Sequence, residues 1–161
     1  MYVPSYFSET RHEVIHELIR AYPLGVLVSI EEGCLETNHI SFYLKVSETG
    51  SAFLLGHVAR LNPIWKQSRE CRTALAIFQG PTSYVSPGWY PSKQEHKEVV
   101  PTWNYVAVHA SGTLRFHEDA QWIRLQMELL TNQMESSQRQ PWAVSDAPNN
   151  YISRRTKVIW H

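Results

Sequence analysis

The residues best suited to bind an anion lie where a strand pattern gives way to a helix pattern. The segment reads Gly56-His57-Val58-Ala59-Arg60-Leu61-Asn62-Pro63. Asn62 and Pro63 are a favourable N-cap and first helical residue, so we expect a helix whose free amides lie beside the donors of His57 and Arg60. Such amides and a guanidinium are suited to a phosphate monoester. The alternative is that Arg60 forms a surface ion pair and His57 is an ordinary strand histidine.

A second group of residues, between positions 78 and 105, is suited to a flat ligand. Prolines and glycines fix its loops, and short polar side chains alternate with aromatic rings, which favours a planar molecule with polar edges. We therefore predict that this stretch binds a planar cofactor, the alternative being a rigid aromatic loop over the end of a barrel. Its six aromatic residues are Phe78, Tyr84, Trp89, Tyr90, Trp103 and Tyr105.

The sequence His12-Glu13-Val14-Ile15-His16 matches the zinc-peptidase pattern, in which two histidines one helical turn apart hold the metal and the glutamate acts as base. No strand pattern precedes it to frame a substrate cleft, and Ile19 and Tyr22 stand where the longer motif has glycine and histidine. A third ligand would have to come from the acidic residues at 31, 32 or 36. We interpret the motif as part of an amphipathic surface helix and assign no catalytic or metal-binding residue.

Further histidines and two cysteines raise the question of metal or haem binding. None has ligand spacing to a second candidate, so hydrogen-bonded histidines and buried cysteines are the simpler interpretation. Two cysteines without a close pair are typical of a reduced, cytoplasmic protein. The residues concerned are His39, His57, His109, His117, Cys34 and Cys71.

The length and charge of the chain narrow its class of function. It has 161 residues, enough for one domain, and its 15 basic and 15 acidic side chains give no net charge. A neutral chain is not drawn to nucleic acid or to anionic membranes, and no window is long and apolar enough to span a bilayer. DNA binding would need a local basic patch, and the basic stretch at 151–157 is also typical of a solvated helix face.

Hydrophobic spacing predicts an α+β domain that is mainly β. Thr10 and Glu13 read as a capping box for a helix over 11–21, and Asp119 as the cap of a long helix with a broad apolar face. A second capping box predicts a short helix over 92–98, and residues 135–150 are expected to be exposed apart from Trp142. Strand patterns joined by short turns, typical of an antiparallel meander, cover 24–30, 34–44, 52–58, 73–78, 82–85 and 103–116.

Nearly the whole chain is covered by six blocks that a known family carries in the same order. They are Pro4-Ser5-Tyr6-Phe7, Asn38-His39-Ile40, Gly56–Arg60 with Asn62-Pro63, Phe78–Pro81, Tyr84–Pro87 with Trp89–Lys93, and Val100–Tyr105. On these blocks the chain resembles the PaiB-type FMN-binding negative transcriptional regulators. The resemblance implies an antiparallel FMN-binding split β-barrel with peripheral helices, as one domain over 1–161 that lacks the usual C-terminal segment of the family.

The resemblance also implies a cytoplasmic, bacterial homodimer with FMN at the subunit interface. The strand-to-helix segment would hold the FMN phosphate, and the aromatic loop would line the isoalloxazine and ribityl side, across the dimer. The phosphate residues would be His57, Ala59, Arg60 and Asn62, and the loop residues Trp89, Tyr90, Lys93, Thr102, Trp103 and Asn104.

The implied function is repression of degradative-enzyme and sporulation genes in bacilli by a flavin-binding regulator with little turnover. Two other functions stay open. One is a flavin-dependent oxidoreductase, in which FMN takes a hydride from NAD(P)H, and the other is a haem-handling split barrel that uses a histidine. No recognition helix with a basic face stands out, so direct DNA binding has little support from charge.

Overall fold

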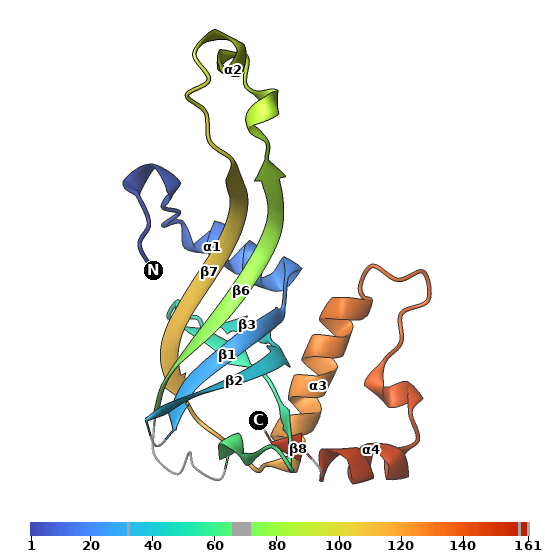
Figure 1. The fold of residues 1–161 in the computed structure, drawn as a ribbon. Coiled ribbons are helices and arrows are strands. Elements are labelled where there is room, and N and C mark those ends of the chain that lie inside the picture. The colour runs from blue at the N-terminus through green and yellow to red at the C-terminus, as the bar shows by residue number, and fades with distance from the viewer. Residues whose placement is uncertain (32, 66–71, 158, 161) are drawn as a thin grey trace.

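The computed structural model describes residues 1–31, 33–65, 72–157 and 159–160. Its centre is a four-stranded antiparallel sheet in the order β2-β1-β6-β7, and two small sheets pair β3 with β4 and β5 with β8 (Figure 1). The strands are β1 (Leu24–Glu31), β2 (Cys34–Ser41), β3 (Tyr43–Val46), β4 (Ala52–Leu55), β5 (Val58–Ala59), β6 (Arg72–Val85), β7 (Thr102–Leu114) and β8 (Ile159–Trp160).

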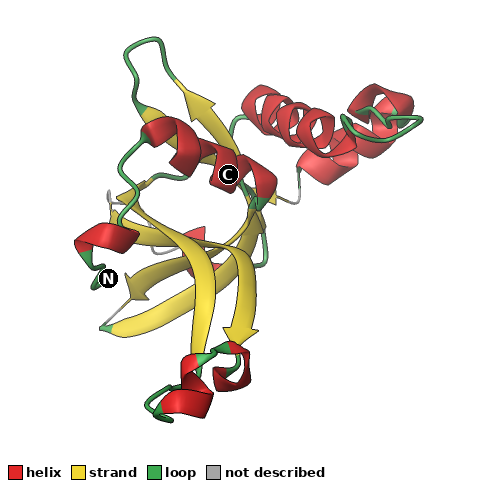
Figure 2. Cartoon of the chain, turned by 90° about the horizontal axis from the view of Figure 1, so that it is seen from above, coloured by secondary structure: helices red, strands yellow, loops and turns green. Residues whose placement is uncertain are grey.

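The helices lie at the periphery of the strands (Figure 2). This arrangement agrees with the predicted α+β, mainly β fold with peripheral helices. None of the helices in the described part of the chain combines the length and hydropathy that a bilayer span requires. The α-helices are α1 (His12–Ala21), α2 (Ser92–Glu95), α3 (Ala120–Glu135) and α4 (Asn149–Thr156), and the 3-10 helices are η1 (Ser5–Phe7), η2 (Pro63–Trp65), η3 (Pro87–Trp89) and η4 (Val144–Asp146).

The side chains of the hydrophobic core come from two helices, α1 and η2, and from the strands β1, β2, β3, β5 and β6, with Phe42 between β2 and β3. At its centre the rings of Phe42 and Phe78 meet edge to face, with centroids 5.7 Å apart. Gly25 allows this contact, because a Cβ there would lie only 2.9 Å from the Phe78 ring. The buried core residues are Ile19, Leu27, Ile40, Phe42, Leu44, Val58, Ile64, Ala74, Ala76 and Phe78.

The core also explains where the predicted strands were wrong. The strand expected over 34–44 is divided at Phe42, whose amide donates to the Pro23 carbonyl while its ring turns into the core. The strand expected over 52–58 is divided at Gly56, where a Cβ would lie 2.8 Å from an Ile40 methyl. By contrast, the stretches at 73–78 and 82–85 form one strand, β6, with a bulge between Gln79 and Thr82.

The helix caps were only partly predicted. Asp119 caps α3 as expected, because its Oδ1 accepts from the amides of Gln121 and Trp122 at 2.7 and 2.9 Å. Neither predicted capping box is found: the N-cap residues are Arg11 for α1 and Pro91 for α2, not Thr10 and Ser92, and neither makes a side-chain cap bond. At α1 the Glu9 carboxylate binds the amide and guanidinium of Arg11 instead, which lowers the pKa of Glu9 to about 2.

Three further predictions about burial were wrong. Phe78, assigned from sequence to the ligand-binding stretch, is 0% exposed and belongs to the core. Trp142 is exposed, and nearby Val144 is buried in its place. Cys34 is exposed on the β1–β2 hairpin, whereas Cys71 and Glu32 lie outside the described residues.

The β6–β7 hairpin reaches beyond the rest of the sheet as an arm, with η3 and α2 at its tip (Figure 1). Its strands stay paired up to Val85 and Thr102. With 13 residues in β7, the arm and its base together span about 40 Å at ~3.3 Å per residue. The predicted aromatic loop therefore lies far from the core that anchors the hairpin.

Candidate functional site

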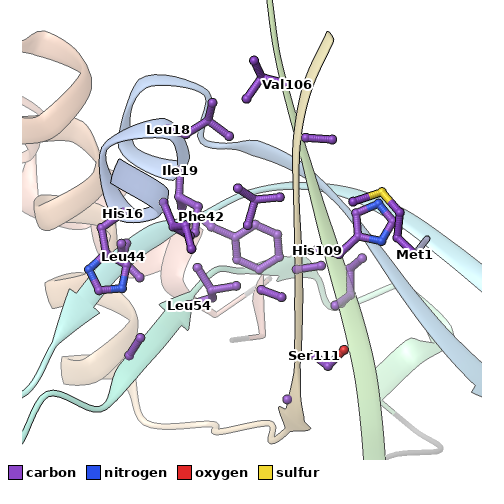
Figure 3. A pocket seen from close by; sticks show the side chains of 18 of the residues that line it. Met1, His16, Leu18, Ile19, Phe42, Leu44, Leu54, Val106, His109 and Ser111 are labelled. Carbon is purple, nitrogen blue, oxygen red and sulfur yellow. The ribbon is translucent and has the colours of Figure 1, made fainter. Parts of the chain in front are cut away.

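An open trough of about 2400 Å³ runs along β7. Most of its lining residues come from the N-terminal segment, α1, β3, β4 and β7. Figure 3 shows Phe42, Leu44 and Leu54 from its apolar inner side, together with Val106, His109 and Ser111 along β7. Ligand pockets usually measure about 300–1,000 Å³, so this trough has room for a cofactor and for further protein.

The segment from Ala59 to Trp65 is held by its own hydrogen bonds. The Asn62 amide donates to the Ala59 carbonyl at 2.8 Å, and the Asn62 side chain accepts from the Ile64 amide at 3.0 Å. Asn62 also donates to Asn38 on β2, and the Trp65 indole donates to the Arg60 carbonyl at 2.8 Å. The segment is thereby fixed against the sheet before any ligand arrives.

The helix expected after Asn62 is only partly described. η2 covers Pro63–Trp65, and residues 66–71, over which a helix would continue, lie outside the described residues. Asn62 occupies the Ile64 amide, so this amide of the predicted anion site is already satisfied within the chain.

Arg60 is the cationic side chain of this segment. Its Nη2 donates to Glu118 Oε1 at 2.7 Å, and the two side chains are 39% and 54% exposed. Arg60 thus forms the surface ion pair that the sequence analysis gave as the alternative to phosphate binding. An exposed pair of this kind contributes about 0–1 kcal/mol, so an incoming phosphate can compete with the carboxylate for the guanidinium.

His57 faces the trough on one side and α3 on the other. It lines the trough, and its Nδ1 lies 2.9 Å from Oε1 of the buried Gln126. The same glutamine donates from Nε2 to the Leu55 carbonyl at 3.5 Å. α3 therefore holds His57 in place through a polar side chain in an otherwise apolar face.

The remaining predicted residues lie on the arm. Trp89 in η3 is 68% exposed, and Tyr90 and Lys93 follow it at the tip. Trp103, the second residue of β7, pairs with Tyr84 on β6, and their rings meet edge to face with centroids 5.6 Å apart. The arm thus presents a row of exposed rings and short polar side chains, including Thr102 and Asn104 on β7.

Within one chain the two predicted groups are not brought together. The segment that carries His57, Ala59, Arg60 and Asn62, here called the junction segment, lies beside α3, whereas Trp89, Tyr90 and Lys93 lie at the tip of the arm, where Figure 1 shows α2. The trough connects the two regions along β7. Five of the ten predicted residues line it: His57, Tyr90, Thr102, Trp103 and Asn104.

The zinc-peptidase match receives no structural support. The rings of His12 and His16 lie one turn apart on α1 with centroids 6.1 Å apart. Within the described residues, no group of three His, Cys, Asp or Glu side chains is placed to hold a metal ion. Of the other histidines, His117 stacks on Trp122 beside the trough, while His39 and His109 lie exposed on strands.

Sequence reasoning missed the contribution of α3. Gln126 follows Ile123 by three residues on the face that packs inward, and a polar residue at such a position was an available signal. Glu118, just before α3, gave no comparable signal, because its pairing with Arg60 depends on contacts between distant segments.

Comparisons with known proteins show to which family this chain belongs. The profile of the family described as "Putative FMN-binding domain" matches residues 1–161. The chain is 33% identical to Uncharacterized protein AN0679 of Emericella nidulans, over 99% of this chain and 77% of the relative. It is 36% identical to Protease synthase and sporulation protein PAI 2 of Bacillus subtilis, over 70% of this chain and 51% of that protein.

A solved structure has a similar fold. The FAD and heme binding protein from Mycobacterium smegmatis matches with a TM-score of 0.63 and 15% identity, over 95% of this chain and 64% of that chain. The present chain therefore spans about half of PAI 2 and less than two thirds of the mycobacterial protein. The likeness shows a split-barrel fold.

The residues present fit a flavin mononucleotide. Arg60 has charged donors that would suit a phosphate, His57 has a ring nitrogen and lines the trough, and the trough combines an apolar inner side with exposed rings such as Trp103. The FMN cofactor predicted from sequence agrees with the family match over the whole chain. This chain is a split β-barrel that binds FMN and belongs to the "Putative FMN-binding domain" family.

Proposed function

We propose that this protein is a flavin-binding regulator that works as a homodimer, with each FMN held between the junction segment of one subunit and the arm of its partner. The observation that carries the proposal is the separation of the two predicted groups along a strand pair of about 40 Å. A flavin mononucleotide is much shorter than this span. A second copy supplies the missing half of each site.

The exposed apolar residues beside the trough support a dimer. Tyr2, Tyr6 and Phe7 of the N-terminal segment are 90%, 79% and 74% exposed, and Trp103 and Tyr105 on the arm are 59% and 60% exposed. Large aromatic side chains grouped at a surface favour burial against another protein. The volume of the trough leaves room for them beside the cofactor.

In this proposal the chain's own residues bind and orient the flavin. Arg60 binds the phosphate, His57 contacts the adjoining chain of the cofactor, and Trp89, Tyr90 and Trp103 cover the ring system. Lys93, Thr102 and Asn104 supply polar contacts at its edge. FMN, when bound, supplies a ring that accepts electrons or hydride, and the protein determines how far solvent and reductants reach it.

The regulatory role is supported by the similarity to PAI 2, a protein named for protease synthesis and sporulation. Because fungi also have relatives of this chain, we do not extend to it the specific target genes that the resemblance implies for bacilli. α4 is the helix we propose for DNA contact, because Arg154 and Arg155 are exposed on it and Lys157 follows. Contacts of this kind bind phosphates and specify no sequence.

Mixing two defective variants tests the shared site. Arg60→Ala damages the junction and Trp89→Ala damages the arm, so each homodimer binds FMN weakly. A mixed dimer has one site with both defects and one intact site, and we expect co-refolded chains to regain tight FMN binding in a fluorescence titration. If the site lay within one chain, the mixture would bind no better than its components, and the proposal would fail.

Two assays test the regulatory role. In a gel shift at moderate salt, Arg154→Ala with Arg155→Ala should abolish retardation of DNA without changing FMN affinity, because phosphate contacts dominate affinity. If the wild-type dimer did not shift the DNA, the proposal that the protein binds DNA directly would be wrong. NAD(P)H oxidation well above that of free FMN would replace the regulator by a flavin reductase, and a Soret band on adding haemin would favour haem handling.

A further inference from the structure

Gln126 is a polar residue in the buried face of α3. Its exposed fraction is 1%, and its neighbour one turn earlier, Ile123, is also 1% exposed. The amide lies between the end of β4 and the residues that connect it to β5, with Nε2 3.5 Å from the Leu55 carbonyl oxygen and Oε1 2.9 Å from His57 Nδ1. Both polar atoms of the buried amide therefore have hydrogen-bond partners.

The contacts of Gln126 fix where the proton of His57 lies. The Leu55 carbonyl only accepts hydrogen bonds, and the NH2 group of Gln126 lies toward it at 3.5 Å. With the amide in this orientation its oxygen faces His57, and because that oxygen also only accepts, the arrangement places the hydrogen on Nδ1. The neutral imidazole then has its lone pair on Nε2, for which the described residues provide no hydrogen-bond partner.

We infer that Gln126 is a positioning residue that holds His57 as a hydrogen-bond acceptor for a hydroxyl of the ligand, namely the ribityl chain of the flavin. A phosphate dianion has no hydrogen to donate and would be repelled by the Nε2 lone pair, whereas ribityl hydroxyls donate readily. Arg60 has donors only and suits the phosphate that ends the same chain. The inference rests on the proposed FMN site and moves His57 from the phosphate, where sequence placed it, to the ribityl group.

The tautomer can be measured in the wild-type protein. Histidine ¹⁵N spectra recorded at about pH 8.5, where imidazole side chains are neutral, should show His57 as the Nδ1–H form. A His57→Gln variant assigns the signal. An Nε2–H form would overturn the inference whether or not flavin binds, so this result is independent of the proposed function.

Ligand binding gives the second measurement. Gln126→Met keeps the length of the side chain but offers Nδ1 only a weakly accepting sulfur, and we expect His57 to lose its single tautomer. Because one hydrogen bond to the ligand is weakened, FMN and riboflavin should both bind about tenfold more weakly at the same pH. The matched control is Gln133→Met on the same helix, where the side chain donates to the Arg20 carbonyl at 3.2 Å, far from the site; it should leave both affinities unchanged.

The two flavins distinguish the possible contacts. Equal weakening of FMN and riboflavin supports a contact to the ribityl chain, because riboflavin lacks the phosphate. Weakening of FMN alone would mean that His57 binds the phosphate and would overturn the inference, as would unchanged affinity for both. If the wild-type protein bound neither flavin, the proposed function would fail, and the tautomer spectrum alone would decide the role of Gln126.

Discussion

At its base the β6–β7 hairpin lies against the core, whereas towards its tip the same two strands expose aromatic rings. Ala76 and Phe78 on the lower part of β6 are 4% and 0% exposed, while Tyr84 and Trp103 beyond the bulge are 45% and 59% exposed. The bulge between Gln79 and Thr82 marks the change. One pair of strands thus serves stability at one end and offers a binding surface at the other.

The comparison teaches that similar side chains have different roles along one hairpin. An aromatic ring below the bulge gains from burial in the core, about 3–5 kcal/mol by truncation. A ring above the bulge has little to pack against within its own chain and contributes to stability only when a ligand or a partner covers it. Mutations on the two sides should therefore affect different measurements.

The largest effect is expected below the bulge. Phe78→Ala removes a fully buried ring that contacts Phe42 and should lower the free energy of unfolding by about 3–5 kcal/mol, measured by urea denaturation of the flavin-free protein. Trp103→Ala, above the bulge, should change it by less than about 1 kcal/mol. Equal losses would show that the arm packs into the core, and the comparison would be wrong.

The next effect concerns the phosphate of the cofactor. Arg60→Ala should weaken FMN about 10- to 100-fold, because a hydrogen bond to a charged group contributes about 1.5–3 kcal/mol. Riboflavin should be little affected, and fluorescence titration with both flavins measures the difference. Arg124→Ala is the matched control, since Arg124 pairs with Glu128 on the exposed side of α3. An equal loss for riboflavin would place Arg60 away from the phosphate.

A smaller effect is expected for the arm. Trp103→Ala should weaken FMN and riboflavin alike, by about 2- to 10-fold, because aromatic stacking contributes about 0.5–1.5 kcal/mol beyond buried area. Trp103→Phe should restore part of the affinity. If the alanine variant discriminated between the two flavins as Arg60→Ala does, Trp103 would not contact the ring system.

Much of the fold could be predicted because local patterns sufficed. The cap of α3 at Asp119 and most strands follow from side-chain spacing and cap chemistry within a few residues. The divisions at Phe42 and Gly56 could not be predicted in this way, since they depend on which ring fills the core and what it meets there. Tertiary packing overrode the continuous strand pattern.

The candidate site was predicted in its residues but not in its arrangement. The side-chain types of His57, Arg60 and Trp103 indicated which ligand groups they could bind. No pattern in the sequence indicated that the junction segment and the tip of the arm lie far apart within one folded chain. The partners of His57 and Arg60, Gln126 on α3 and Glu118 just before it, join segments that are 69 and 58 residues apart in sequence. Such contacts become visible only when the chain is folded.

The smallest effect tests whether Glu118 competes with the cofactor for Arg60. Glu118→Gln removes the carboxylate charge that faces the Arg60 guanidinium at 2.7 Å. Since an exposed pair contributes about 0–1 kcal/mol, FMN should bind up to about fivefold more tightly, while riboflavin, which has no phosphate, should be unchanged. The matched control is Glu128→Gln, which breaks the Arg124 pair elsewhere on α3. Weaker FMN binding by Glu118→Gln would mean that the carboxylate orients Arg60 toward the phosphate, and the competition proposed here would be wrong.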